Sequence, residues 1–179
     1  MAAYVSVAEA QAYFDERLHE TAWSQASGTE RTKSLLAATR IINTLNYKGY
    51  KNSVYLAFQA DTELCLKFQQ GDATALATVR AAEAAQANEF PRGADTTVPE
   101  NIQVACYEIA YALLDGVDPD LELENLTVNN HGIGNVRASF NRNQDPLEHV
   151  TNGVPSATAW RLLKPFLRDD NHIRFVRVS

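Results

Sequence analysis

Histidine, cysteine and serine side chains could support catalysis or metal binding, but here their spacing suits neither. A serine hydrolase needs a nucleophile elbow of the type G-x-S-x-G, and nucleotide-binding loops and zinc proteases have their own signatures; none of these occurs. Cys65 and Cys106 lack a second Cys or a His at ligand spacing, so we expect two core thiols. The histidines are isolated from one another: His19, His131, His149 and His172. We therefore expect no enzyme, no metal and no cofactor.

Four acidic residues alternate between positions 118 and 124: Asp118, Asp120, Glu122 and Glu124. Calcium loops alternate in this way, but this segment lacks the Gly at the sixth position and the Glu at the twelfth. We expect instead a solvated, charged edge of an extended strand.

The chain has a net charge of -6, which disfavours general attraction to nucleic acid, because that affinity depends on Lys and Arg. Residues 108–124, which begin with Glu108, carry acidic side chains and no Lys or Arg, whereas residues 161–177 are rich in Arg and Lys. These segments are either two solvated surfaces or opposite ends of neighbouring copies that attract each other head to tail.

At 179 residues and 45% hydrophobic content, the chain can bury the core of one soluble domain. It has no apolar run of the roughly 18 residues that would span a bilayer, and we expect no membrane contact. Capping boxes, Ser6 with Glu9 and Ser27 with Glu30, predict helices over residues 7–19 and from 28 towards Gly49. Apolar residues at helical spacing predict a core helix from Pro99 to Gly116.

Residues 51–88 are harder to assign. Asp61 can cap a short helix that passes Phe68 and ends at Gly71. The alanine-rich segment 73–87 has high helix propensity but few large apolar side chains, so we expect a mobile surface excursion with little packing. A turn follows at residues 90–93, where Arg92 can tie the turn to a carboxylate or to backbone carbonyls.

Strand patterns occur only near the C-terminus. Leu126 to Val128, turn residues 129–132 and alternating apolar residues up to Phe140 predict a β-hairpin. A short helix between Pro155 and Pro165 follows. The last strand-like run has no evident partner: Ile173, Arg174, Phe175, Val176, Arg177 and Val178. Such an edge either pairs with another subunit or folds back on its own hairpin.

The order of these motifs resembles the head-to-tail adaptor, or head-completion, proteins of tailed bacteriophages. Each motif alone is loose, and the specificity lies in their order, above all in an aromatic-Pro-Arg turn directly before a V-P-x-x helix. The matching segments are Tyr4-Val5-Ser6, residues 35–42, Tyr47-Lys48-Gly49, Phe90-Pro91-Arg92, Val98-Pro99-Glu100, Gly132-Ile133-Gly134 with the strand to Phe140, and residues 162–167.

The resemblance implies a mainly α fold: a helical bundle with a small β-hairpin and an extended C-terminal arm. Residues 1–168 would form the adaptor domain, with an insertion at 51–88, where relatives tend to be shorter, and the hairpin region at 121–141. Residues 169–179 would form the arm.

The implied function is structural. About twelve copies would form a ring in the virion neck, between the portal protein and the next neck or tail-completion protein, after synthesis in the host cytoplasm. Double-stranded DNA would pass without sequence-specific binding, and the acidic residues 118–124 could face that channel or lie on the outer surface. Residues 173–178 would pair with another copy or with the portal.

Similar sequences also resemble a DnaT-like, single-strand-binding replication group. That function requires exposed aromatic side chains interleaved with Lys or Arg. Phe14, Trp23 and Trp160 instead fall on or near the predicted apolar stripes, which favours the adaptor.

Overall fold

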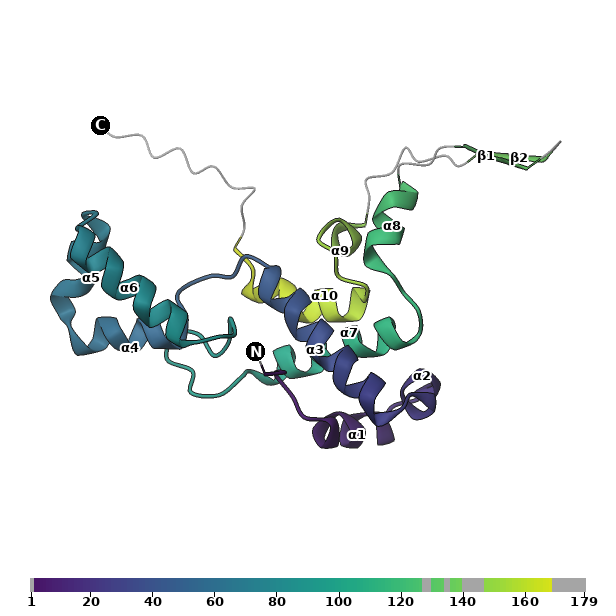
Figure 1. Cartoon of the computed structure of the whole chain (residues 1–179), viewed down its shortest axis with the longest axis horizontal. Coiled ribbons are helices and arrows are strands. Elements are labelled where there is room, and N and C mark those ends of the chain that lie inside the picture. The colour runs from purple at the N-terminus through teal and green to yellow at the C-terminus, as the bar shows by residue number, and fades with distance from the viewer. Residues whose placement is uncertain (1, 127–129, 134–135, 140–146, 169–179) are drawn as a thin grey trace.

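The protein folds mainly as α-helices, with a single pair of short strands described (Figure 1). The computed structural model describes residues 2–126, 130–133, 136–139 and 147–168. In chain order the elements are α1 (Val7–Asp15), α2 (Thr21–Gln25), α3 (Gly28–Thr44), α4 (Asn52–Ala60), α5 (Thr62–Gln69), α6 (Ala73–Ala85), α7 (Glu100–Leu114), α8 (Pro119–Leu126), β1 (Asn130–Ile133), β2 (Val136–Ser139), α9 (Glu148–Thr151), α10 (Ala157–Leu163) and the 3-10 turn η1 (Lys164–Phe166).

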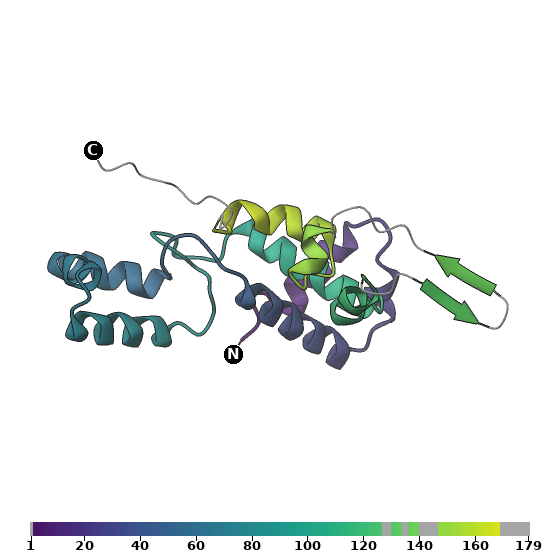
Figure 2. The same cartoon turned by 90° about the horizontal axis from the view of Figure 1, so that it is seen from above.

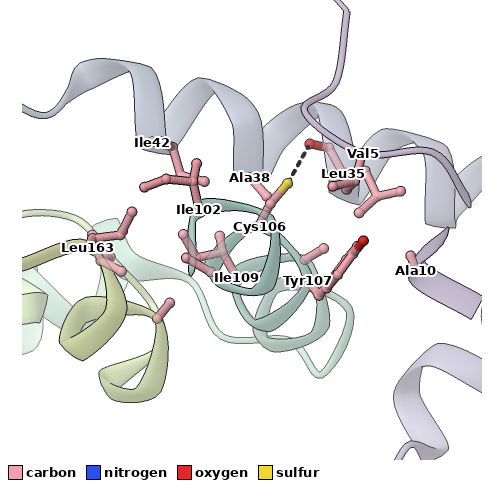
Figure 3. Close-up of a cluster of buried hydrophobic side chains, with 14 of the residues drawn as sticks. Val5, Ala10, Leu35, Ala38, Ile42, Ile102, Cys106, Tyr107, Ile109 and Leu163 are labelled. Atoms are coloured by element: carbon pink, nitrogen blue, oxygen red, sulfur yellow. Dashed lines mark hydrogen bonds between the residues drawn. The ribbon is translucent and has the colours of Figure 1, made fainter. Parts of the chain in front are cut away.

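The core lies where α7 packs between α3 and α10 (Figure 3). The stripe predicted from the sequence forms this core, and Cys106 is fully buried, as expected. Cys65, by contrast, is only half-buried. The central side chains of the core, most of them fully inaccessible to solvent, are Leu35, Ala38, Ile42, Ile102, Cys106, Ile109 and Leu163. This arrangement confirms a helical bundle.

The first helix is shorter than predicted. Both capping boxes are present, but α1 ends at Asp15 and His19 takes a left-handed backbone conformation with φ 65. Leu18, expected on the buried stripe, is 80% exposed, so nothing holds the last turn against the core. Trp23 enters the core from the separate helix α2, where its ring stacks on Phe14 at a centroid distance of 4.6 Å.

Residues 51–88 form a unit of three helices. The alanine-rich segment is helical as predicted, but α6 packs against α4 and α5, which corrects the expectation that residues 73–87 have little packing. Helices α4, α5 and α6 contact one another around a small cluster of their own, made of Val54, Leu64, Ala75 and Val79 (Figures 1 and 2). Asp61 caps α5 as predicted, accepting hydrogen bonds from two backbone amides. Small side chains of α6 take part in this packing: Ala75 is buried in the cluster, and Ala82 packs against it. We call α4–α6 the three-helix unit.

The acidic segment after α7 is helical, which corrects the prediction of an extended strand. Asp118 precedes α8 and accepts hydrogen bonds from the amides of Asp120 and Leu121, at 3.0 and 3.3 Å. This local cap outweighs the alternation of charge. Asp120, Glu122 and Glu124 therefore belong to α8.

Strands β1 and β2 pair antiparallel, from Asn130 opposite Ser139 to Ile133 opposite Val136. The hairpin register differs from the prediction: Leu126, expected in the first strand, ends α8, and Asn130 to Gly132, expected in the turn, belong to β1. Residues 134–135, which join the strands, and the predicted C-terminal arm lie outside the described residues.

Candidate functional site

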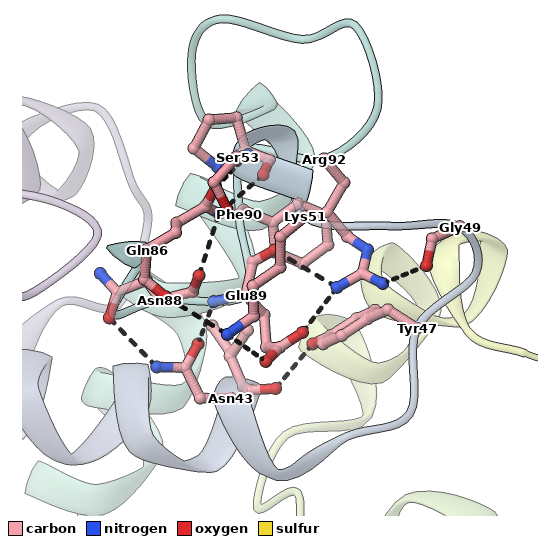
Figure 4. Close-up of polar contacts among 12 residues, drawn as sticks. Asn43, Tyr47, Gly49, Lys51, Ser53, Gln86, Asn88, Glu89, Phe90 and Arg92 are labelled. Carbon is pink, nitrogen blue, oxygen red and sulfur yellow. Dashed lines mark hydrogen bonds and ion pairs between the residues drawn. The ribbon is translucent and has the colours of Figure 1, made fainter. Parts of the chain in front are cut away.

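The predicted turn at Phe90-Pro91-Arg92 is the centre of the most highly connected polar site described in the chain (Figure 4). As predicted, Arg92 ties the turn to backbone carbonyls and to a carboxylate. Its Nε donates to the carbonyl of Lys48 at 3.0 Å, and its Nη2 to that of Gly49 at 2.6 Å. Its Nη1 lies 2.5 Å from Oε2 of Glu89. One guanidinium thus joins two distant segments of the chain.

Aromatic rings surround Phe90, which is only 3% exposed. Tyr47 and Phe166 meet it edge to face, at centroid distances of 4.7 and 5.7 Å, and Tyr4 lies at 6.2 Å. The Tyr47 hydroxyl donates to the carbonyl of Ile42 at 2.8 Å. Burial raises the pKa of both Tyr4 and Tyr47 above the usual value. These rings fill the end of the core and exclude water from the turn.

Part-buried polar groups complete the turn. The Tyr4 hydroxyl donates to Asn43 and accepts the amide hydrogen of Phe90. The same Asn43 oxygen accepts from the amide of Glu89 at 3.0 Å. Lys51 Nζ lies 3.1 Å from Glu89, so that carboxylate is held by two cations. The sequence alone did not reveal the role of Asn43 or the pairing of Glu89 with Lys51, because both contacts join distant segments.

The three-helix unit is fixed to the core at this same place. Lys51 and Arg92 form an isolated antiparallel bridge, and the amide of Asn52 donates to the carbonyl of Pro91 at 3.0 Å. Gln86 accepts from the amide of Ser53 at 3.1 Å and donates to the carbonyl of Pro91 at 2.8 Å. The two chain segments that enter and leave the unit are therefore joined by backbone and amide hydrogen bonds.

The segment that precedes the predicted arm is anchored here too. The amide of Lys48 donates to the carbonyl of Phe166, and the amide of Arg168 to that of Asn46, both at 2.9 Å. We call the site the hub and define it as residues 43–53, 86–92 and 166–168 with Tyr4. It fixes the directions in which two parts of the chain leave the bundle.

A groove of about 470 Å³ opens between the hub and the three-helix unit. Its apolar lining comes from Tyr50, Val54, Phe68 and Val79. The charged residues along it are Lys51, Glu83, Glu89, Arg92 and Arg168. Such a groove could accept an apolar side chain flanked by acidic groups.

The other chemistry-bearing residues are not gathered into a site. Within the described ranges, no three His, Cys, Asp or Glu side chains lie close enough to hold a metal ion. His149 lies in the last turn of α9, His131 on β1, and His172 outside the described residues. The hub offers structural contacts in place of a nucleophile with its base.

The predicted interface residues are placed as follows. Asp118, Asp120 and Glu124 are exposed, and the Glu122 side chain is not described. Glu108, the first acidic residue of the predicted run, is buried: Tyr13 donates to it at 2.6 Å and Arg17 lies 3.0 Å away. It therefore belongs to the core. The six predicted arm residues lie outside the described part of the chain: Ile173, Arg174, Phe175, Val176, Arg177 and Val178.

Comparison of the chain with family models, curated proteins and solved structures gives no match. Among the described helices, none has both the length and the apolar character needed to cross a membrane.

Proposed function

We propose that this chain is a structural head-to-tail adaptor of a tailed bacteriophage, without enzymatic activity, copies of which form a ring in the virion neck. The hub carries this proposal. Several of the segments by which the sequence resembles adaptors are far apart in the chain, yet Tyr4, residues 47–49, Phe90-Pro91-Arg92 and Phe166 contact one another there. Because these segments form one structural centre, we expect them to occur together in sequences that share this fold.

The hub suits an assembly subunit. A ring needs each copy to present its contact surfaces at fixed angles, because small errors in angle prevent closure. The hub holds the three-helix unit and the start of the C-terminal segment against the end of the bundle through short hydrogen bonds and ion pairs, part-buried or exposed. Residues 169–179 would leave from this fixed point towards a neighbouring copy or the portal protein.

The proposed partners are further copies, about twelve in the ring, the portal protein and the next neck or tail-completion protein. Double-stranded DNA would pass through the ring without sequence-specific contact. Asp118, Asp120 and Glu124 are exposed on α8, as either a channel lining or an outer surface requires. Acidic groups along a channel would repel the phosphates and keep the DNA from adhering.

The alternative, a DnaT-like module that binds single-stranded DNA, has a single exposed aromatic ring in the described part of the chain, Tyr50, which lines the groove together with Lys51, Arg92 and Arg168. Base stacking needs exposed rings beside cations. Phe14 and Trp23 are fully buried and Trp160 is 7% exposed, while Tyr50 is the only exposed aromatic side chain among the described residues.

Two experiments test the proposed function. Gold-labelled antibody against the protein should mark the neck of intact virions, and a virus with a stop codon early in its gene should accumulate DNA-filled heads and separate tails. Complete, infectious virions without the protein would refute the adaptor. An oligonucleotide titration provides the control for the alternative, because tight binding that weakens steeply with salt would favour the DnaT-like module.

A further inference from the structure

The two ends of the helical bundle carry opposite charge. The N-terminus of α3 lies beside the C-terminus of α7, where Glu30 and Asp115 line the same shallow hollow. Helix α8 extends this end with Asp118, Asp120 and Glu124, all exposed. Among the cations at this end, Arg17 pairs with Glu108, Arg31 donates to the carbonyls of Trp23 and Ser24, and Lys33 is exposed on α3 near Glu30. Carboxylates therefore outnumber exposed cations here. We call this surface the acidic end.

The hub forms the opposite end. Lys51, Arg92 and Arg168 line its groove, with Lys48 exposed between two lining residues. Glu83 and Glu89 also line the groove, and Glu89 engages both Lys51 and Arg92, much as Glu108 engages Arg17 at the acidic end. The exposed cations of this end are therefore Lys48 and Arg168. We call this surface, the groove with Lys48, the basic end.

Exposed apolar side chains accompany the charges. On α8, Leu121 is 54% and Leu123 42% exposed, and this helix packs mainly on the short helix α9 (Figure 1). The groove of the basic end offers two rings in return: Tyr50, which is 43% exposed, and Phe68, which is half-buried. Leucines flanked by carboxylates on one surface thus match rings flanked by cations on the other.

One copy cannot join its own two ends. Helix α3 has 17 residues, so it separates them by about 25 Å at 1.5 Å per residue. Figures 1 and 2 place α8 and the three-helix unit on opposite sides of the bundle. Within the described residues, therefore, the two ends of one copy cannot contact each other.

We propose that α8 of one copy docks into the groove of the basic end of the next copy. The contact joins two different surfaces, so it propagates head to tail, and it closes into a ring when the rotation between copies allows. The inference rests on the proposed function in that an adaptor ring needs such a contact. It differs in its test, which requires no virion.

Charge reversal with mixing tests the contact in the full-length protein. An acidic-end variant carries Asp120→Lys and Glu124→Lys, and a basic-end variant carries Lys48→Glu and Arg168→Glu. Analytical ultracentrifugation at low salt should show that the wild type self-associates. In each variant the affinity of self-association should fall by about tenfold or more. An equimolar mixture of the two variants should associate again, because every contact then joins opposite charges.

The mixture separates a broken interface from a broken fold, since a misfolded variant is not rescued by a second one. The matched controls, Glu63→Lys and Lys67→Glu, change exposed charges on α5 and should leave association unchanged. A wild type that stays monomeric up to its solubility limit would overturn the inference, as would a mixture without association. If association follows the charges but virion necks lack the protein, the contact stands and the adaptor function fails.

Discussion

The bundle core and the three-helix unit are held together in different ways. The core buries large side chains completely, among them Phe14, Trp23 and Ile109. In the unit, α6 is rich in alanine, and the rings of Phe58 and Phe68 are only partly covered. The unit instead depends on polar contacts at the hub, where Arg92 and Gln86 join its two ends. The comparison teaches that attachment can replace burial in fixing a small helical unit.

Alkaline pH should have the largest effect, and it acts on the core and the hub. Burial raises the pKa of Cys106 from 9.0 to about 12, and raises those of Tyr4 and Tyr47. The folded state thus keeps protons that the unfolded state loses above pH 9 to 10. The stability is complete below that range and falls as the pH rises, by about 5 kcal/mol at pH 11 for the three groups.

Urea unfolding followed by circular dichroism between pH 8 and 11 measures this loss. Cys106→Ala is the control, because it should remove the part of the loss that begins near pH 9. A urea midpoint that stays constant over the whole range would contradict the burial of these groups.

Removing one aromatic ring from the core and one from the three-helix unit compares how firmly the two regions are packed. Phe14→Ala empties a fully buried site beside Trp23 and should lower the free energy of unfolding by about 3–5 kcal/mol. Phe68→Ala, in the three-helix unit, removes a half-buried ring and should cost about 1–2 kcal/mol. Urea denaturation of both variants gives the two values. Equal losses would show that the unit is as firmly packed as the core.

Replacement of Arg92 tests the attachment itself. In Arg92→Lys one ammonium replaces a fork that reaches two carbonyls and Glu89, so we expect a loss of about 2–3 kcal/mol. Hydrogen exchange should become faster in α4 and α6 while α7 stays protected. Arg80→Lys, on the exposed side of α6, is the matched control and should change neither the free energy of unfolding nor the hydrogen-exchange rates. Equal acceleration in α7 would mean that the unit and the core open together.

Local signals explain what the sequence predicted well. Both capping boxes, the Asp61 cap and the α7 stripe depend on residues within a turn or two of one another, and the structure confirms each. The role of Arg92 was also predicted, because a fork of donors at a tight turn suits carbonyls and a carboxylate, although its carbonyl partners, Lys48 and Gly49, lie more than 40 residues away.

The wrong predictions involve competition between a pattern and its surroundings. Alternating carboxylates suggested a strand, but the Asp118 cap and the helical spacing of α8 prevail. Leu18 fits the spacing of α1, yet no element covers it. The hub partners Asn43 and Gln86 carry no signal in the sequence, since their contacts link segments more than 30 residues apart.

The smallest expected loss of stability comes from removing one helix cap in each region. Ser27 caps α3 and Asp72 caps α6, each by accepting a backbone amide three residues later, so Ser27→Ala and Asp72→Ala should each cost about 1 kcal/mol. The consequences differ because α3 is a core helix, whereas α6 lies in the unit. Ser27→Ala should lower global stability in urea, and Asp72→Ala should mainly accelerate hydrogen exchange within α4–α6. If Asp72→Ala instead lowered protection evenly in α3, α7 and α6, the three-helix unit would be part of one cooperative fold with the bundle, and its attachment at the hub would not define a separate unit.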